Sequence, residues 1–231
     1  DIEVTTVEPA CFGENTGSIS IVITGGVDPY DVIWTGPNGF SSTATDITNL
    51  VAGSYDLVVT DAGTCASSLT IDLDEPEELN VVADITDIIC GGANSGAIDI
   101  TIEGGQGPFD VVWSAPGFNA LTEDIFDLEA GSYTLDILDN NGCSFTASYD
   151  VSETVPIDIT LDTADSSCNE SNGSASVTTT GGLDPVTITW YDEDFFEIGT
   201  GLSIADLPAG TYVVEATDGN DCVMGETFSI S

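Results

Sequence analysis

The feature that most constrains the fold of this chain is a set of sequence landmarks that returns three times. Over 231 residues, a cysteine is followed by a glycine pair, a proline, a tryptophan, an Ala-Gly-[Ser/Thr]-Tyr turn and a second cysteine, always in that order. The first cysteine recurs after 79 and then 78 residues. Repeats of this length predict one structural unit per copy. We therefore predict three tandem domains, at residues 1–75, 76–153 and 154–231.

Apolar residues within each copy recur at every second position, which indicates β-strands rather than helices. Ile19, Ile21 and Ile23 show this alternation in the first copy, and residues 97–102 show it in the second. Each copy contains six or seven such runs, separated by Gly, Asn, Asp and Pro. That number and spacing are typical of a sandwich. The sequence predicts an all-β chain of three immunoglobulin-like antiparallel β-sandwich domains.

The landmark residues have structural roles by default. The tryptophan is predicted to fill the core between two sheets rather than to offer a stacking surface to a ligand. The tyrosine resembles a tyrosine corner, whose hydroxyl bonds back to the turn before its strand. The glycine pair predicts a turn with positive φ, and an aspartate four residues before the second cysteine is expected to close a hairpin. In chain order these residues are Trp34, Trp113 and Trp190; Tyr55, Tyr133 and Tyr212; Gly25-Gly26, Gly104-Gly105 and Gly181-Gly182; and Asp61, Asp139 and Asp218.

Each copy carries two cysteines, 53 or 54 residues apart. This spacing predicts one disulfide inside each domain, which stabilises the fold by about 4 kcal/mol in the chain-entropy model. The chain has no histidine and no Cys-x-x-Cys motif, so a zinc site is not expected. Stable disulfides place the protein outside the cytoplasm. The predicted pairs are Cys11 with Cys65, Cys90 with Cys143 and Cys168 with Cys222.

The charge of the chain excludes several functions. It has 41 Asp and Glu residues but no Lys, Arg or His, which gives a formal net charge of −41. Phosphate backbones are bound mainly by basic side chains, so nucleic acid is not an expected partner. An anionic membrane surface would repel the chain, and no apolar run of about 20 residues is present to insert into a membrane.

Hard cations such as calcium bind carboxylate oxygens, and acidic turns offer such ligands. The calcium candidates are Asp28, Asp31, Asp61, Asp139 and Asp218. No segment matches an EF-hand loop, and the alternative explanation of the charge is solubility.

Catalysis is not expected. Activated nucleophiles usually depend on His or Lys, and the chain has neither. Two carboxylates alone can hydrolyse glycosides, but close acidic pairs are expected by chance among 41 acids. The alternative to a purely structural role is direct binding of polysaccharide by the repeats, with or without calcium. Its candidates are aromatic residues in loops, which otherwise cap loops or pack between domains: Phe40, Phe118, Phe195 and Phe196.

The joins between copies are short. Residues 73–77 and 151–156 contain proline and acidic residues rather than a flexible Gly/Ser run, so we expect an extended rod. The first residues lack the basic start and apolar core of a signal peptide. The chain is therefore expected to be a mature protein or an internal fragment of a longer one.

Taken together, the motifs resemble the SprB repeat. They are Cys-x(2–4)-Asn, Gly-Gly-x-x-Pro-[Tyr/Phe], the lone Trp, Leu-x-Ala-Gly-[Ser/Thr]-Tyr and Asp-x-x-x-Cys. The third copy departs from them, with Val186 where the others have Tyr30 and Phe109. That repeat occurs in tandem in very large surface adhesins of gliding Bacteroidota.

The resemblance implies a segment of a gliding-motility or attachment adhesin. Such an adhesin is exported by type IX secretion and displayed outside the cell as a filament attached to the outer membrane. The implied partners are extracellular surfaces or polysaccharides bound by the parent adhesin, neighbouring repeats and other motility proteins.

Overall fold

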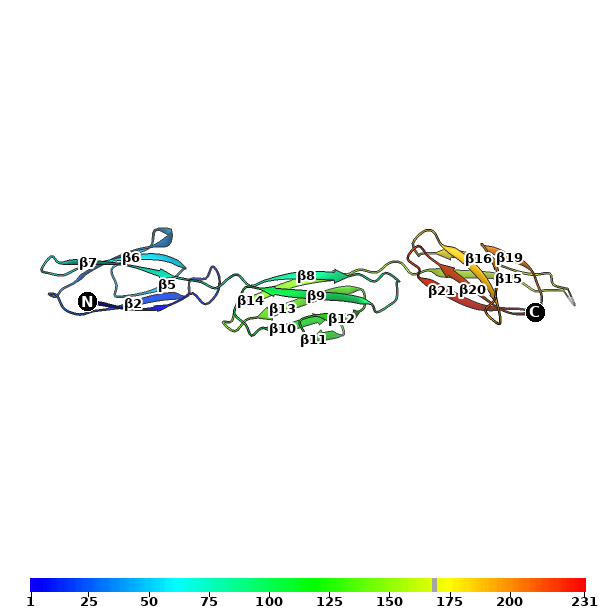
Figure 1. Cartoon of the computed structure of the whole chain (residues 1–231), viewed down its shortest axis with the longest axis horizontal. Helices are drawn as coiled ribbons and strands as arrows, with labels where there is room; N and C mark the ends of the chain where they lie inside the picture. The colour runs from blue at the N-terminus through cyan, green and yellow to red at the C-terminus, as the bar shows by residue number, and fades with distance from the viewer. Residues whose placement is uncertain (168–169) are drawn as a thin grey trace. The chain divides into compact units, whose positions relative to one another are not determined.

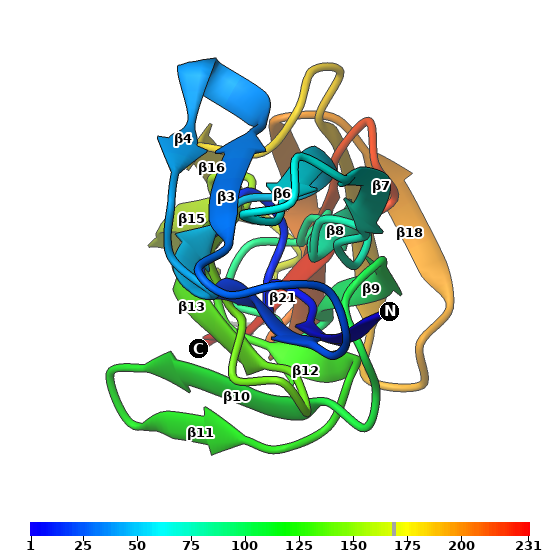
Figure 2. The same ribbon diagram turned by 90° about the vertical axis from the view of Figure 1, so that its left-hand side faces the viewer.

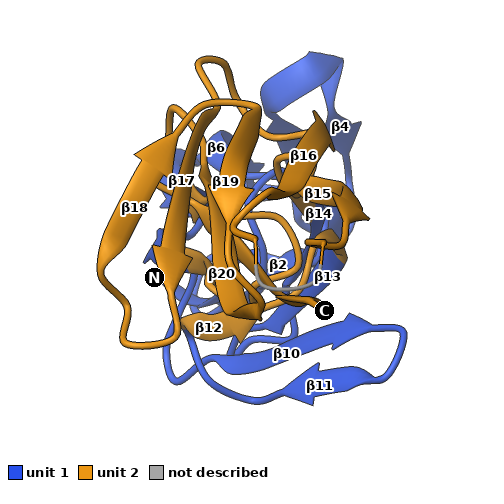
Figure 3. Cartoon of the chain, turned by 90° about the vertical axis from the view of Figure 1, so that its right-hand side faces the viewer, with its two compact units in different colours: residues 1–84, 99–123, 133–148 blue, residues 85–98, 124–132, 149–231 orange. Residues whose placement is uncertain are grey.

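The computed structural model describes residues 1–167 and 170–231, and its regular secondary structure is almost entirely antiparallel β-strand (Figure 1). No helix in these two ranges is long and apolar enough to cross a membrane. The chain divides into two compact units (Figure 3). Unit 1 comprises residues 1–84, 99–123 and 133–148, and unit 2 comprises residues 85–98, 124–132 and 149–231. The middle sequence copy contributes to both units, and the three domain boundaries stay a prediction.

The first copy forms a two-sheet sandwich within unit 1. One sheet has the order β1-β2-β5 and the other β4-β3-β6-β7. The first, second and fifth strands thus lie together, and the third and sixth lie side by side, which is the strand order of immunoglobulin-like sandwiches. The elements are β1 (Ile2–Val7), β2 (Gly17–Ile23), β3 (Asp31–Thr35), a 3₁₀ turn (Pro37–Gly39), β4 (Ser41–Ser42), β5 (Asp46–Leu50), β6 (Gly53–Thr60) and β7 (Ala66–Leu73).

The alternation in the sequence determines which side chains enter this core. In β2, Ile19 and Ile21 are buried while the serine between them is only half-buried. In β6, Tyr55 and Leu57 are buried, and the residue between them is exposed. These inward faces meet around Trp34, which is fully buried.

The second copy repeats the same strand order, with sheets β12-β9-β8 and β11-β10-β13-β14. β10 and β11 form an antiparallel hairpin, visible at the lower edge of Figure 2. The elements are β8 (Asn80–Thr86), β9 (Gly96–Glu103), β10 (Asp110–Ala115), β11 (Phe118–Ala120), β12 (Ile125–Leu128), β13 (Gly131–Leu138) and β14 (Ser144–Val151).

The third copy is a sandwich within unit 2, with sheets β15-β16-β19 and β18-β17-β20-β21. Trp190 lies in its core beside Phe228, with ring centroids 5.6 Å apart and planes at 84°. The elements are β15 (Asp158–Ala164), β16 (Gly173–Thr180), β17 (Thr187–Asp192), β18 (Glu197–Thr200), β19 (Ser203–Leu207), β20 (Gly210–Thr217) and β21 (Val223–Ile230).

The glycine pairs form the turns between the second and third strands of each copy. All six glycines have positive φ, between 60° and 80°, a region that a residue with a Cβ rarely adopts. The Asp28-Pro29, Gly107-Pro108 and Asp184-Pro185 peptide bonds after them are cis.

Candidate functional site

The structure pairs the cysteines differently from the sequence prediction. Cys11 is bonded to Cys143, and Cys90 is bonded to Cys222, each across 132 residues of sequence. The Cα–Cα distances are 5.6 and 5.4 Å. Each bridge therefore joins the first cysteine of one sequence copy to the second cysteine of the next. The prediction of one disulfide inside each domain is wrong. Cys65, for example, is a free, exposed thiol.

The remaining predicted pair, Cys168 with Cys222, is also wrong, because Cys222 is bonded to Cys90. Cys168 itself lies outside the described residues.

The geometry of one copy explains why its own two cysteines do not pair. Cys11 precedes β2, whereas the hairpin of Cys65 reaches Gly26 just beyond the other end of β2, where Asp61 lies about 3.0 Å from the Cβ position of Gly26. A strand of seven residues spans about 24 Å. A disulfide needs Cα atoms within about 7 Å of each other. The two cysteines of one copy are therefore at opposite ends of the sandwich.

A hairpin closed by an aspartate holds the second cysteine of each copy. In the second copy, Asp139 Oδ1 accepts hydrogen bonds from the backbone N–H groups of Cys143, at 2.8 Å, and Asn141, at 2.9 Å. Its Oδ2 accepts one from the N–H of Gln106, at 2.9 Å, in the turn after the glycine pair. Burial by itself would raise the pKa of Asp139, but these N–H donors hold it below its ordinary value.

Asp218 has the same role in the third copy. It accepts hydrogen bonds from the N–H groups of Leu183, at 3.0 Å, Asn220, at 2.8 Å, and Cys222, at 3.0 Å. The bond from Leu183 contributes most to lowering the pKa of Asp218, against the opposing effect of burial. The hairpin that carries each cross-linked second cysteine is thus tied to the neighbouring glycine turn.

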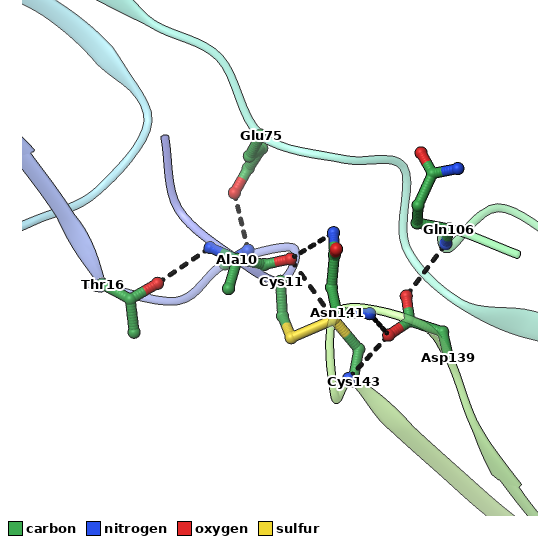
Figure 4. The surroundings of a disulfide bond; sticks show 9 residues. Ala10, Cys11, Thr16, Glu75, Gln106, Asp139, Asn141 and Cys143 are labelled. Atoms are coloured by element: carbon green, nitrogen blue, oxygen red, sulfur yellow. Dashed lines mark hydrogen bonds between the residues drawn. A yellow bond between two sulfur atoms is a disulfide. The ribbon is translucent and has the colours of Figure 1, made fainter. Parts of the chain in front are cut away.

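The first cross-link is surrounded by further polar contacts (Figure 4). The N–H of Gly13 donates to Glu75 Oε2 at 2.6 Å, so an acidic residue at the end of the first copy holds the loop that follows Cys11. The Asn141 side-chain amide donates to the carbonyl of Ala10 at 3.2 Å. We call residues 10–13, Glu75, Gln106 and residues 139–143 the first joint.

The second cross-link reproduces this arrangement within unit 2. The N–H of Gly92 donates to Glu153 Oε2 at 2.9 Å, which matches the contact of Gly13 with Glu75. Gly91 packs so closely on the linker that an added Cβ would lie 2.2 Å from the carbonyl oxygen of Thr154. We call residues 89–92, residues 153–156, Leu183 and residues 218–222 the second joint.

The structure does not gather the calcium candidates into a site. Asp61, Asp139 and Asp218 accept hydrogen bonds from backbone N–H groups of three separate hairpins. Asp28 and Asp31 are exposed. Across residues 1–167 and 170–231, no group of three or more His, Cys, Asp or Glu side chains is arranged to hold a metal ion.

The three tryptophans lie in the cores and do not offer a stacking surface. Trp34, Trp113 and Trp190 are fully buried. Each indole N–H donates to a backbone carbonyl: Trp34 to Ala44 at 2.9 Å, and Trp190 to Gly201 at 2.7 Å. Trp113 makes the same kind of bond, to the carbonyl of residue 123 at 3.1 Å.

The tyrosines after the Ala-Gly turn are also buried. The Tyr55 hydroxyl donates to the carbonyl of Val51 at 2.9 Å, and that of Tyr212 donates to Pro208 at 2.8 Å, the geometry of a tyrosine corner. Tyr133 occupies the equivalent buried position.

The four aromatic candidates for polysaccharide binding fall into two groups. Phe40 packs edge-on against Tyr55, with ring centroids 5.5 Å apart, and Phe118 packs the same way on a buried tyrosine. Phe195 and Phe196 are 68% and 70% exposed in the turn between β17 and β18. Only the second group offers free ring faces.

The family comparison agrees with the repeat pattern. The model of the SprB repeat matches residues 4–39, 82–118 and 160–195. The chain carries three tandem SprB repeats. Each match begins in the first strand of a repeat and includes its first cysteine and its glycine pair, while the second cysteine lies beyond the match. SprB repeats are segments of cell-surface adhesins, which indicates an extracellular, structural protein.

The other comparisons add little. No curated protein matches the chain. Among solved structures, eight N-terminal Ig domains of Down Syndrome Cell Adhesion Molecule are 14% identical, with a TM-score of 0.43 over 99% of this chain. This chain spans only 34% of that one. The two-domain DIP-gamma IG1+IG2 is 17% identical, with a TM-score of 0.35 over 68% of this chain and 97% of its own. Likeness at this level carries no inference about function.

Proposed function

We propose that this chain is a non-catalytic stalk segment of a large secreted cell-surface adhesin that acts in gliding motility or surface attachment. The observation that carries the proposal is the disulfide connectivity, because each bridge joins one SprB repeat to the next. The peptide linker and the disulfide then form two covalent connections at each join. A segment built in this way transmits tension between repeats without depending on non-covalent packing alone.

The composition fits the same role. Trypsin-like proteases cut after Lys or Arg, and the chain has neither. A net charge of −41 keeps neighbouring molecules apart in solution. In the parent adhesin, the partners of such a stalk are extracellular surfaces or polysaccharides gripped by other domains, together with cell-surface proteins of the motility machinery.

The test is the adhesion of beads that carry this chain alone. Beads coated with the three-repeat chain are expected to wash off polysaccharide surfaces as readily as beads coated with an inert acidic protein. Retention of the beads above that background would contradict a stalk role, because it would show that the repeats themselves grip the surface.

A second candidate function is direct contact with polysaccharide through Phe195 and Phe196, which is favoured by their exposure. Aromatic rings commonly stack on the apolar faces of sugar rings. If beads are retained, the Phe195→Ala/Phe196→Ala variant should lose retention. Phe126→Ala is the matched control, since Phe126 is also exposed, at 59%, but lies on β12. Equal retention by both variants would remove this candidate.

A further inference from the structure

Cys65 is held by the same hairpin as the two cross-linked second cysteines. Its N–H donates to Asp61 Oδ1 at 2.8 Å, and the N–H of Asp61 donates to the carbonyl of Cys65 at 3.0 Å. The corresponding distances are 2.8 and 2.9 Å at Cys143, and both are 3.0 Å at Cys222. The first repeat therefore presents a free thiol on the same backbone that carries a disulfide in the other two repeats.

In the second and third repeats, the glycine pair contacts the linker that precedes the repeat. In the third repeat, the N–H of Gly182 donates to the carbonyl of Val155 at 3.0 Å. A Cβ added to Gly181 would lie 2.0 Å from the carbonyl oxygen of Pro156, and the second repeat has the same arrangement. Gly25 has the same positive φ, but a Cβ added there would meet no atom within 4 Å.

A hollow beside Cys65 has a counterpart in the third repeat, where segments of the neighbouring repeat form part of its wall. The hollow has a volume of about 170 Å³, and its lining includes Gly25, Gly26, Asp61 and Cys65. The counterpart at Cys222, of about 340 Å³, is lined by Cys90, Gly91 and the linker residues 154–157. At this position the third repeat therefore contacts two segments of its neighbour, the loop of a first cysteine and the linker.

We propose that Cys65 is the acceptor of a third cross-link, from the first cysteine of a further SprB repeat joined ahead of Asp1. The occupant of this face is the Cys-x-Gly loop of that repeat with the linker that follows it, because these two segments lie beside Cys222 and line its hollow. The inference does not depend on whether the segment is a stalk or binds polysaccharide.

The bond forms by thiol–disulfide exchange with a small disulfide oxidant such as glutathione disulfide. The Cys65 thiolate attacks one sulfur of the oxidant, forms a mixed disulfide and releases one glutathione thiolate. The thiolate of the incoming first cysteine then attacks the Cys65 sulfur and releases the second glutathione thiolate. Two protein thiols are oxidised, their two protons pass to solvent or to the released thiolates, and one glutathione disulfide is reduced to two glutathione molecules.

The test extends the full chain by one repeat in register. Asp158 is the equivalent of Asp1, so a copy of residues 80–157 placed directly ahead of Asp1 continues the repeat. After oxidation in glutathione buffer, the protein is digested at Asp and Glu without reduction, and the linked peptides are identified by mass spectrometry. Cys65 is expected in a peptide linked to the added copy of Cys90, and the added copy of Cys143 takes its place as a free thiol.

Three results would overturn the proposal. The first is a free Cys65 in an extended chain that contains Cys11–Cys143 and Cys90–Cys222. The second is the absence of those two bonds, which would show that a first cysteine does not pair with the second cysteine of the next repeat. The third is Cys65 bonded to another molecule of the chain, which would replace an in-chain partner by a second copy. In the matched control, the added copy of Cys90 is changed to Ser, and Cys65 is expected to stay free.

Discussion

Reducing the two disulfides should roughly triple the length of the fully unfolded chain under tension. In the oxidised chain, the shortest covalent path runs from Asp1 to Cys11, crosses to Cys143, returns to Cys90, crosses to Cys222 and ends at the C-terminus. The path contains about 72 residue steps, or about 250 Å at roughly 3.5 Å per residue. The reduced chain has about 230 steps and reaches about 800 Å.

Removing one bridge distinguishes the observed disulfide pairing from the alternative in which each domain has its own disulfide. With Cys90 and Cys222 both changed to Ser, the bridge from Cys11 to Cys143 remains, and the path has about 98 steps, or about 340 Å. If the cysteines paired within domains, only Cys11–Cys65 would survive the same change, and the path would reach about 600 Å.

The assay is single-molecule force spectroscopy with handles at the two termini. Each chain is stretched to full unfolding, first oxidised and then in reducing buffer, and the total contour length is compared. A length near 600 Å for the variant without Cys90 and Cys222, or no gain in length on reduction of the parent, would refute the connectivity.

Three further predictions concern the stability of the hairpins and joints. The pKa of Asp139 is lowered in the folded state, so its contribution to stability is complete above its unfolded pKa of about 3.9 and is lost as the pH falls through the folded pKa. The stability difference between the parent and Asp139→Asn in urea unfolding should therefore shrink from pH 6 to pH 2, and a difference that stays constant over this range would contradict the prediction. Gly91→Ala should destabilise the chain by about 1–3 kcal/mol because its Cβ would overlap the linker. Gly131→Ala, with no atom within 4 Å of its Cβ, is the matched control, and equal melting temperatures for the two would contradict the close packing. Tyr55→Phe should cost about 1 kcal/mol by leaving a turn carbonyl without its donor, and an unchanged urea midpoint would show that the hydroxyl contributes nothing.

The fold of each repeat could be predicted from the sequence because the signals that determine this fold are local. Alternation over a few residues determines which side of a strand faces the core, and Ile19 and Ile21 are buried for that reason. The aspartate before the second cysteine closes its hairpin through N–H groups only two and four residues away, at Asp139 as at Asp218.

The candidate ligand sites depended on the tertiary structure. The composition gives the number of carboxylates but not which of them accept hydrogen bonds from the backbone. Three of the calcium candidates, Asp61, Asp139 and Asp218, accept such bonds in three separate hairpins. The same limit applied to the aromatic residues. Phe40 is partly covered by its contact with Tyr55, while Phe195 is exposed, although both follow the third strand of their repeat.

The repeat, the strands and the places of the cysteines along the chain could all be predicted from the amino-acid pattern, whereas the partner of each cysteine depends on how the sandwich folds. In a tandem repeat, a partner in the same copy and a partner in the next copy recur with the same period, so spacing cannot distinguish them. The distinction comes from β2, which places Cys11 and Cys65 at opposite ends of one sandwich. The physical reason is that a disulfide requires Cα atoms within about 7 Å, and a strand of seven residues is more than three times that length.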